Sequence, residues 1–464
     1  MSNITHIRKI YFIGIGGIGM SGLAIISKRM GYEVLGSDIS ESYITKRLKN
    51  EKIKVFLGHK EANLEKDVDL VVISSAIKSD NIELKKAQRI KIPIIPRAKF
   101  LSLLASKSKT IAVCGTHGKT TTTSMITSIF EASKAKYTSV IGGISKHIDS
   151  NIKFHKGQYF IIEADESDGS FLYYSPFIIC VTNIDNDHLD FYKNLENIKK
   201  IFTTFINKLP FYGRAILCGD DKNIRDIIPS INAPFFTYGF NPENDWQIKN
   251  KRQNINGVSF EIFHKGKREA LINLRVFGNH NILNATASYL TALYIGFDKK
   301  TITEGLLSFK GVKRRLDIIG KVGKTLFYDD YGHHPTEIKN TLASLRSFYP
   351  ERKIIAIFQP HRYTRTKMLY KEFGKCFKDA DNIYVTKIYP AGEKPIKGIS
   401  EKNIIKELMK NGEKVFEFTS PIEIAKNIKN GDIVISIGAG DVYKILDEIK
   451  LKYESIVLNL YEKI

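Results

Sequence analysis

A glycine-rich turn carries the residue types that bind the phosphates of a nucleotide. Segment 115–123 reads GTHGKTTTT and follows an apolar run at 110–114. Gly118, Lys119 and Thr120 form the centre of a P-loop. In such a loop backbone N–H groups surround the phosphates, the lysine reaches the β- and γ-phosphates, and the hydroxyl binds Mg²⁺. The turn therefore predicts ATP and Mg²⁺ as ligands.

The spacing of this loop departs from the standard pattern in one respect. Val113 stands where a P-loop has its first glycine, so we expect a shortened form. Its place between an apolar run and a helical stretch supports the assignment. The residues expected to contact ATP are Gly115, Thr116, His117, Gly118, Lys119, Thr120 and Thr121.

Two acid-rich segments follow the next apolar runs. Glu163 opens the sequence EADESD, and His188 lies within TNIDNDHLD at 182–190. Because ligands bind at the carboxyl ends of parallel strands, Glu163 and His188 are candidates for a second Mg²⁺ beside the γ-phosphate. The alternative for His188 is an ordinary surface histidine. The neighbouring acids, which either support the ligands or are merely solvated, are Asp165, Glu166 and Asp168.

A second glycine turn lies near the start of the sequence. Gly14, Gly16 and Gly19 fit G-x-G-x-x-G, and Asp38 follows 19 residues after Gly19. Such a turn lets the backbone approach a pyrophosphate at a helix N-terminus. A dinucleotide is the default ligand, although any nucleoside diphosphate satisfies the same physics. A tight strand–helix turn without a ligand remains the alternative.

Four later motifs are dense in His, Asn, Arg and Asp. They read GNHNILNA (278–285), GVKRR (311–315), DDYGHHPTE (329–337) and QPHRYTRT (359–366). The planar fork of arginine suits carboxylates and phosphates, so Arg362 and Arg365 are candidate anion clamps. Taken singly, either arginine could be ordinary helix-surface charge.

The elements that must position these residues show as short apolar runs. They are Ile10–Ile13, Leu70–Ile73, Thr110–Cys114, Phe160–Glu163, Ile178–Thr182, Ile354–Phe358 and Ile433–Ile437. Such runs are typical of strands buried on both faces, and their alternation with amphipathic stretches predicts parallel sheets in an α/β protein. The length of 464 residues suggests about two to four domains. The polar segment 102–109 is a candidate linker, and a second boundary is expected near 320–324.

Composition excludes several classes of protein. With 43% hydrophobic and 26% charged residues, whole-chain disorder is excluded. The net charge of +22 comes from scattered lysines, which indicate a solvated surface rather than a nucleic-acid site. The four cysteines form no CxxC, which argues for a reducing, cytoplasmic setting. The uncharged stretch 10–27 contains five glycines, so we expect no membrane insertion.

Together and in this order, the motifs resemble those of the Mur ligase family, over essentially the whole chain. The segments that carry the resemblance are GIGGIGMSGLA (14–24), GSD (36–38), SSAI (74–77), the P-loop, EADESD, TNIDNDHLD, GNHNILNATA (278–287), VKRR (312–315), DDYGHHPTE, QPHRYTRT and YPAGE (389–393). The resemblance implies three domains. They are a UDP-sugar-binding Rossmann-like domain at 1–107, a central P-loop ATPase-like domain at 108–320, and an amino-acid-binding Rossmann-like domain at 321–464.

The resemblance also implies roles for particular residues. The UDP diphosphate would occupy the first glycine turn, with contacts from Gly16, Gly17, Ile18, Gly19, Asp38, Ser74 and Ser75. The magnesium ligands would be Thr120, Glu163 and His188. Asn281, Arg315 and Asp330 would contact ATP. The catalytic residues would be Lys119, His188, His333, His361, Arg362 and Arg365. Of these, His333, Arg362 and Arg365 would face the amino acid and the reacting phosphate.

The reaction implied is the ATP-dependent joining of L-alanine to the lactyl carboxylate of UDP-N-acetylmuramate through an acyl phosphate. Either His333 or His361 would accept the proton of the amine or simply orient it. Ser167 and Glu337 favour alanine over a preformed tripeptide, which the recycling member of the family adds to the same sugar nucleotide. We expect a monomer or homodimer that binds no nucleic acid. A P-loop ATPase switch and a nicotinamide-dependent dehydrogenase are the rival classes.

Overall fold

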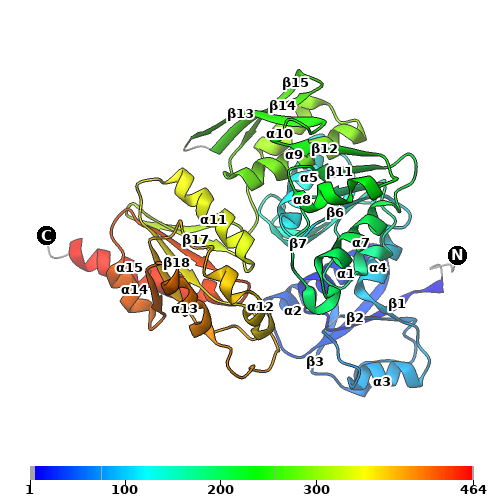
Figure 1. Cartoon of the computed structure of the whole chain (residues 1–464). Coiled ribbons are helices and arrows are strands. Elements are labelled where there is room, and N and C mark those ends of the chain that lie inside the picture. The colour runs from blue at the N-terminus through cyan, green and yellow to red at the C-terminus, as the bar shows by residue number, and fades with distance from the viewer. Residues whose placement is uncertain (1–5, 75, 255–256, 462–464) are drawn as a thin grey trace. The chain divides into compact units, whose positions relative to one another are not determined.

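Three β-sheets organise the part of the chain that the computed structural model describes (Figure 1). That part is the whole chain except residues 1–5, 75, 255–256 and 462–464. Two compact units make up the chain. The first comprises Met1–Asn250, Glu261–Ile272 and Leu283–Phe309, and the second comprises Lys251–Phe260, Asn273–Ile282 and Lys310–Ile464.

The first sheet has five parallel strands in the order β3-β2-β1-β4-β5. The strands are β1 (Lys9–Ile13), β2 (Glu33–Asp38), β3 (Lys54–Leu57), β4 (Leu70–Ile73) and β5 (Ile94–Pro96). The helices between and after them are α1 (Ile18–Arg29), α2 (Tyr43–Asn50), α3 (Ile82–Arg89) and α4 (Arg97–Ala105). Every residue of β1 is buried, as its apolar run predicted. The first glycine turn joins β1 to α1 at the carboxyl edge of the sheet.

The second sheet has ten strands in the order β15-β14-β13-β12-β11-β10-β6-β9-β7-β8. They are β6 (Lys109–Cys114), β7 (Tyr137–Ser145), β8 (Ser150–Phe154), β9 (Tyr159–Glu163), β10 (Ile178–Val181), β11 (Arg214–Cys218), β12 (Phe235–Gly239), β13 (Trp246–Asn254), β14 (Gly257–His264) and β15 (Lys267–Leu274). The helices of this part are α5 (Lys119–Ser133), α6 (Leu189–Tyr192), α7 (Leu195–Ile206), α8 (Lys222–Ile227), α9 (Asn279–Ile295) and α10 (Lys299–Leu307). Strand β6 lies between β9 and β10 and runs parallel to both, so the P-loop and the two acid-rich segments emerge from three adjacent strands.

The third sheet has six strands in the order β16-β17-β21-β18-β19-β20. They are β16 (Asp317–Val322), β17 (Thr325–Asp330), β18 (Ile354–Phe358), β19 (Asn382–Val385), β20 (Val415–Glu417) and β21 (Ile433–Ile437), with α11 (Pro335–Phe348), α12 (Tyr363–Phe373), α13 (Glu401–Lys410), α14 (Pro421–Asn427) and α15 (Val442–Tyr461). The sheet is parallel except for the β16–β17 hairpin. Alternate residues of β18 enter two cores, with Ala356 on one face and Ile357 on the other.

The structure confirms the predicted α/β class, and the seven predicted runs coincide with strands to within one residue at either end. The candidate linker 102–109 is corrected in part. Residues 102–105 complete α4, whose apolar residues Phe100, Leu101 and Leu104 are buried.

All four cysteines are buried and free. No helix in the described ranges is long and apolar enough to cross a membrane.

Candidate active site

The turn between β6 and α5 takes a form that only glycine allows at two positions. Gly115 has φ +126° and Gly118 has φ +82°, both in the region that favours glycine. A Cβ on Gly115 would overlap Thr182, and one on Gly118 would lie 2.7 Å from Asn284 Oδ1. The backbone of the turn is therefore packed closely against Thr182, which follows β10, and against Asn284 of α9.

Lys119 stands at the start of α5 and turns back over the loop. Its Nζ donates to the carbonyl oxygens of Gly115 (2.6 Å) and Thr116 (3.1 Å) and to Glu166 Oε1 (2.9 Å). Burial opposes the charged form, but the nearby carboxylates, Glu166 foremost, raise the pKa of Lys119 above its ordinary value. The ammonium is thus a fixed positive charge at the place where the P-loop pattern predicts phosphate.

Thr120 and Glu163, two of the three predicted metal ligands, are in direct contact. Thr120 Oγ1 donates to Glu163 Oε1 at 2.9 Å, and Glu163 Oε2 accepts from the N–H of Gly142 at 2.6 Å. The third, His188, places Nε2 3.8 Å from Glu166 Oε1. A hydroxyl and a carboxylate beside a phosphate loop are oxygen donors of the kind that Mg²⁺ prefers. Thr120 and Glu163 therefore fit a magnesium ion, whereas the contact found for His188 is with Glu166 and not with these two residues.

The segment after β10 braces the loop from its other side. His117 donates its backbone N–H to Asn183 Oδ1 at 2.8 Å, and its Nε2 lies 3.1 Å from Asp185 Oδ2. The N–H of Asp185 donates to Thr116 Oγ1 at 2.8 Å. Thr121 lies in the first turn of α5 and is half-buried. His117 and Thr116 therefore connect the loop to the second acid-rich segment.

The first glycine turn is held by the end of β2. The N–H groups of Gly14 and Ile15 both donate to Ser37 O at 2.9 Å, and the N–H of Gly16 donates to Asp38 Oδ2 at 2.7 Å. Gly17 and Ile18 are exposed at the start of α1. Asp38 thus stabilises the turn itself, and the exposed residues beside it remain available to a diphosphate.

The other predicted UDP-sugar residues lie after β4. Ser74 Cβ would lie 3.3 Å from a Cβ on Gly14, so Ser74 borders the glycine turn. Its Oγ accepts from the N–H of Ala76 at 3.3 Å. Ser75 lies outside the described residues. Ser74 is therefore placed beside the predicted diphosphate site.

Arg97 is a residue of this region that the sequence patterns did not reveal. A Cβ on Gly19 would lie 2.7 Å from its Nη1, so the guanidinium rests against the start of α1. The pKa of Asp165 is lowered: burial opposes the carboxylate, but Lys119, hydrogen bonds from Ser167 and the charge of Arg97 outweigh it. Arg97 therefore brings positive charge between the glycine turn and the EADESD segment. The IPRAKF stretch contained it, but no spacing rule marked it.

In the second unit, Asp330 and Arg315 share one electrostatic environment. Asp330 Oδ2 accepts from the N–H of Leu316 and Oδ1 from the N–H of Gly332, each at 2.8 Å. Burial raises the pKa of Asp330 to about 6, although Arg315 opposes the shift. Arg315 Nη1 also donates to Glu337 Oε1 at 3.1 Å. The two predicted ATP residues of this unit are therefore neighbours.

Asn281, the third of them, lies in the first turn of α9. It is 7% exposed, and its Nδ2 donates to Phe277 O at 2.8 Å. Burial and then the charge of Arg315 lower the pKa of the adjacent His280 to about 4. The GNHN segment is thus electrostatically coupled to the VKRR segment through His280.

Three predicted residues of the third sheet gather around His361. Its ring centroid lies 5.8 Å from that of His333, and its Nδ1 lies 3.4 Å from Arg365 Nη1. The ring also stacks on Tyr389, with centroids 5.6 Å apart and an interplanar angle of 8°. Burial, then Arg365 and Arg362, lower the pKa of His361 to about 4, so the ring is neutral at neutral pH.

Arg362 precedes α12 with a backbone that is rare for its residue type. Its φ is +71°, in the region that favours glycine. Its N–H donates to Tyr389 O at 2.8 Å. Glu393 caps the start of α12, accepting from the N–H of Thr364 at 3.0 Å and from Thr364 Oγ1 at 2.7 Å. The YPAGE segment therefore fixes the arginine-rich motif.

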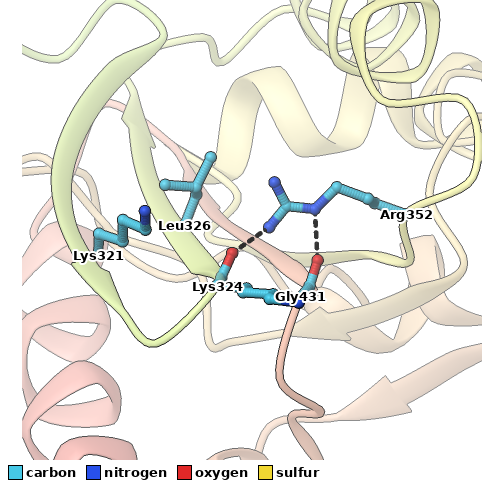
Figure 2. Close-up of a pocket in the computed structure, with 5 residues that line it drawn as sticks. All are labelled: Lys321, Lys324, Leu326, Arg352 and Gly431. Carbon is cyan, nitrogen blue, oxygen red and sulfur yellow. Dashed lines mark hydrogen bonds between the residues drawn. The ribbon is translucent and has the colours of Figure 1, made fainter.

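A hollow of about 450 Å³ lies at the opposite edge of the same sheet (Figure 2). Arg352 reaches across it and donates from Nη2 to Lys324 O at 2.6 Å and from Nε to Gly431 O. Strands β17 and β21 begin here, whereas His361 follows the carboxyl end of β18. Ligands of parallel sheets bind at carboxyl ends, so this hollow lies apart from the candidate site. Its lining residues are Lys321, Lys324, Leu326, Arg352 and Gly431.

Models of one protein family match almost the whole chain. The Mur ligase family catalytic domain matches residues 9–109, the Mur ligase middle domain matches 113–292, and the Mur ligase glutamate ligase domain matches 314–440. The UDP-N-acetylmuramate–L-alanine ligase of Pelobacter propionicus is 46% identical over 444 residues, 94% of this chain and 96% of that protein. The enzyme of the same name from Endomicrobium trichonymphae is 42% identical over 442 residues, 95% of this chain and 98% of that protein.

Solved structures show the same fold. The UDP-N-acetylmuramate–alanine ligase of Thermotoga maritima superposes with a TM-score of 0.81 at 29% identity, covering 96% of this chain and 99% of that one. A murein peptide ligase from Psychrobacter arcticus reaches a TM-score of 0.73 at 25% identity, covering 96% and 99%.

Proposed function

This chain belongs to the Mur ligase family, and we propose that it joins L-alanine to the lactyl carboxylate of UDP-N-acetylmuramate with ATP as phosphoryl donor. The products are UDP-N-acetylmuramoyl-L-alanine, ADP and phosphate, which makes the protein an ATP-dependent ligase of peptidoglycan precursor synthesis. The observation that carries the proposal is the placement of Lys119 over the glycine turn, beside the paired Thr120 and Glu163.

A carboxylate needs activation before an amine can displace one of its oxygens. Transfer of the γ-phosphoryl group of ATP to the lactyl carboxylate gives an acyl phosphate, from which phosphate can leave. Lys119 and the turn amides would hold the γ-phosphate and offset the repulsion between the two anions. Thr120, Glu163 and His188 would hold Mg²⁺, which neutralises charge on the phosphates when bound.

The amine of alanine must attack as the neutral base. A pKa of about 4 makes His361 a weak proton acceptor, so we assign it the orienting role and leave His333 as the candidate base. Arg362 and Arg365 would bind the carboxylate of the amino acid, because a guanidinium fork matches a carboxylate. Asn281 and Asp330 are assigned to the adenosine, and Arg315 is assigned to ATP.

The first glycine turn would bind the UDP diphosphate at the start of α1, because the N–H groups of Gly14, Ile15 and Gly16 already donate to Ser37 and Asp38. Gly16, Gly17, Ile18 and Gly19 would surround it, and Arg97 adds a cation there. Asp38, Ser74 and Ser75 complete the proposed contacts to UDP-N-acetylmuramate.

We propose three functional domains, 1–107 for the UDP-sugar, 108–320 for ATP and 321–464 for the amino acid. The last boundary would cut β16, which pairs with β17, so the hairpin favours a start of the third domain at or before Asp317. We propose that the protein is a monomer or homodimer. We also propose that it acts in the cytoplasm, since ATP and a nucleotide sugar are its substrates.

The alternative activity within the family is the addition of a preformed tripeptide. The structural likeness to the murein peptide ligase of Psychrobacter arcticus is the reason to test it. One assay separates the two: ADP release with UDP-N-acetylmuramate and, in turn, alanine, glycine, serine and the tripeptide. Release that depends on alanine supports the proposal, and release that depends only on the tripeptide overturns it. Release without any sugar nucleotide would instead indicate a P-loop ATPase. Transfer of labelled oxygen from the lactyl carboxylate into phosphate would test the acyl phosphate.

A further inference from the structure

A fully buried carboxylate in the first sheet collects hydrogen bonds that the proposed reaction does not explain. Glu83, in the first turn of α3, is 0% exposed. Its five donors are Tyr11 Oη (3.0 Å), Ser37 Oγ (2.5 Å), His59 Nδ1 (3.0 Å), Lys60 N (3.1 Å) and Asn63 Nδ2 (2.7 Å). In the part of the chain that the structure describes, no arginine or lysine side chain donates a hydrogen bond to this carboxylate. A buried carboxylate held this way is costly unless every bond is made, so the cluster fixes the groups that contact it.

The cluster determines which nitrogen of His59 carries a proton. Nδ1 lies 3.0 Å from Glu83 Oε2 and 3.0 Å from Ser37 Oγ. The hydroxyl of Ser37 already donates to Glu83, so both oxygens can only accept from the ring. Nδ1 therefore bears the proton, and in the neutral ring Nε2 presents a lone pair. Among the described residues Nε2 has no hydrogen-bond partner, and the side chain is 15% exposed.

His59 lies where a nucleoside would extend from the first glycine turn. The N–H of Gly58 donates to Asp38 O at 2.8 Å, and Asp38 in turn binds the N–H of Gly16. In a doubly wound sheet the nucleoside extends from the diphosphate along the carboxyl edge, away from the first strand. On one side of β1 the next strands are β2 and then β3, and His59 lies two residues after the end of β3. Ile39, which is 77% exposed, adds an apolar surface after β2.

We propose that Glu83 is a positioning residue that fixes the Nε2 lone pair of His59 as an acceptor for the N3–H of uracil, so that the pair selects a uridine nucleotide. This inference rests on the proposed function for the class of nucleotide and extends it to the base. Uracil offers a donor at N3, whereas cytosine offers a lone pair there. A fixed acceptor on His59 therefore forms a hydrogen bond with uracil, whereas its lone pair is repelled by the lone pair of cytosine.

The test compares binding of UDP and CDP to the full chain by titration calorimetry. We expect the wild type to bind UDP roughly 10- to 100-fold more tightly than CDP. UDP forms one hydrogen bond with His59, whereas CDP places two lone pairs opposite each other. In Glu83→Gln an amide N–H can donate to Nδ1 of His59. The ring can then carry its proton on Nε2, which no longer presents a fixed lone pair. The preference should then fall to within about threefold. In the ligation assay the same variant should raise the KM for UDP-N-acetylmuramate and leave kcat at saturation near the wild-type value.

Two further variants separate positioning from folding. Tyr11→Phe removes a different donor from Glu83 and should lower the unfolding midpoint while keeping the UDP preference. Glu61→Gln alters an exposed carboxylate paired with Arg89 and should change neither. If Glu83→Gln fails to fold, His59→Asn takes its place and should lose the same preference.

The inference is overturned if the wild type binds UDP and CDP equally, or if folded Glu83→Gln and His59→Asn proteins keep the wild-type ratio. Its failure differs from that of the proposed function. The base preference is read from binding alone, whereas the proposed function fails only if the wild type releases no ADP with UDP-N-acetylmuramate and alanine.

Discussion

Lys119 Nζ lies 2.9 Å from the carboxylate of Glu166, a side chain that is only 2% exposed. The lysine that the P-loop pattern assigns to phosphate therefore has a buried counter-charge in the protein itself. Glu166 was among the acids whose role the sequence left open, and burial excludes the solvated alternative. The pair joins the loop after β6 to the segment after β9.

The first prediction follows from this pair. Lys119→Ala should abolish ADP release, because no other side chain in the described loop supplies a cation to the γ-phosphate. It should also lower the free energy of unfolding by about 3–5 kcal/mol, since Glu166 is left buried without its partner. ADP release and urea unfolding measure the two effects. The double variant Lys119→Ala/Glu166→Gln should regain most of the stability and none of the activity. An active single variant would contradict the assignment.

The second prediction concerns the proposed metal ligands. Glu163→Gln removes the charge that contacts Thr120, so the Mg²⁺ concentration for half-maximal phosphate release should rise by about 10- to 100-fold. A magnesium titration at saturating ATP measures this. Asp168→Asn, an exposed acid of the same segment, is the matched control and should leave the titration unchanged. If both variants behave alike, Glu163 does not hold the metal.

Local chemistry explains what the sequence could reveal. Runs such as Ile354–Phe358 predicted strands because a strand buried on both faces must be apolar along its length. Lys119 and Thr120 were found because a P-loop is contiguous. The stack of His361 on Tyr389 was hidden, since it depends on a parallel bridge between segments distant in the chain. The His59–Glu83 contact was hidden for the same reason, although each residue is a common titratable type.

The third prediction concerns acid stability. The pKa of His361 is lowered from 6.5 to about 4, first by burial and then by Arg365 and Arg362. The fold thus favours the neutral ring, and this contribution is fully present above pH 6.5 and is lost as the pH falls from 6.5 towards 4. His361→Gln should therefore lose less stability than the wild type on acidification. Urea unfolding at about pH 7 and about pH 4.5 measures the difference. His155→Gln, at an exposed position, should behave like the wild type.

The fourth prediction separates stability from turnover at Arg362. Its φ of +71° is a conformation in which a non-glycine residue costs about 1–3 kcal/mol. Arg362→Gly should relieve this strain and raise the unfolding midpoint, because the N–H bond to Tyr389 O is kept. Turnover should nevertheless fall by about 100-fold or more, since the guanidinium proposed to bind the amino acid is gone.

Arg352 offers a control variant with the opposite expected effects on stability and turnover. It donates to the carbonyl oxygens of Lys324, Gly431 and Asp432 at the amino edge of the same sheet. Arg352→Ala should therefore lower stability by about 1–3 kcal/mol with kcat unchanged in the protein that remains folded. Melting curves and steady-state ligation rates for both variants complete the comparison. Should Arg362→Gly retain wild-type turnover, the arginine is held in its strained conformation for a reason other than catalysis, and the amino-acid site must be sought elsewhere along the carboxyl edge of the sheet.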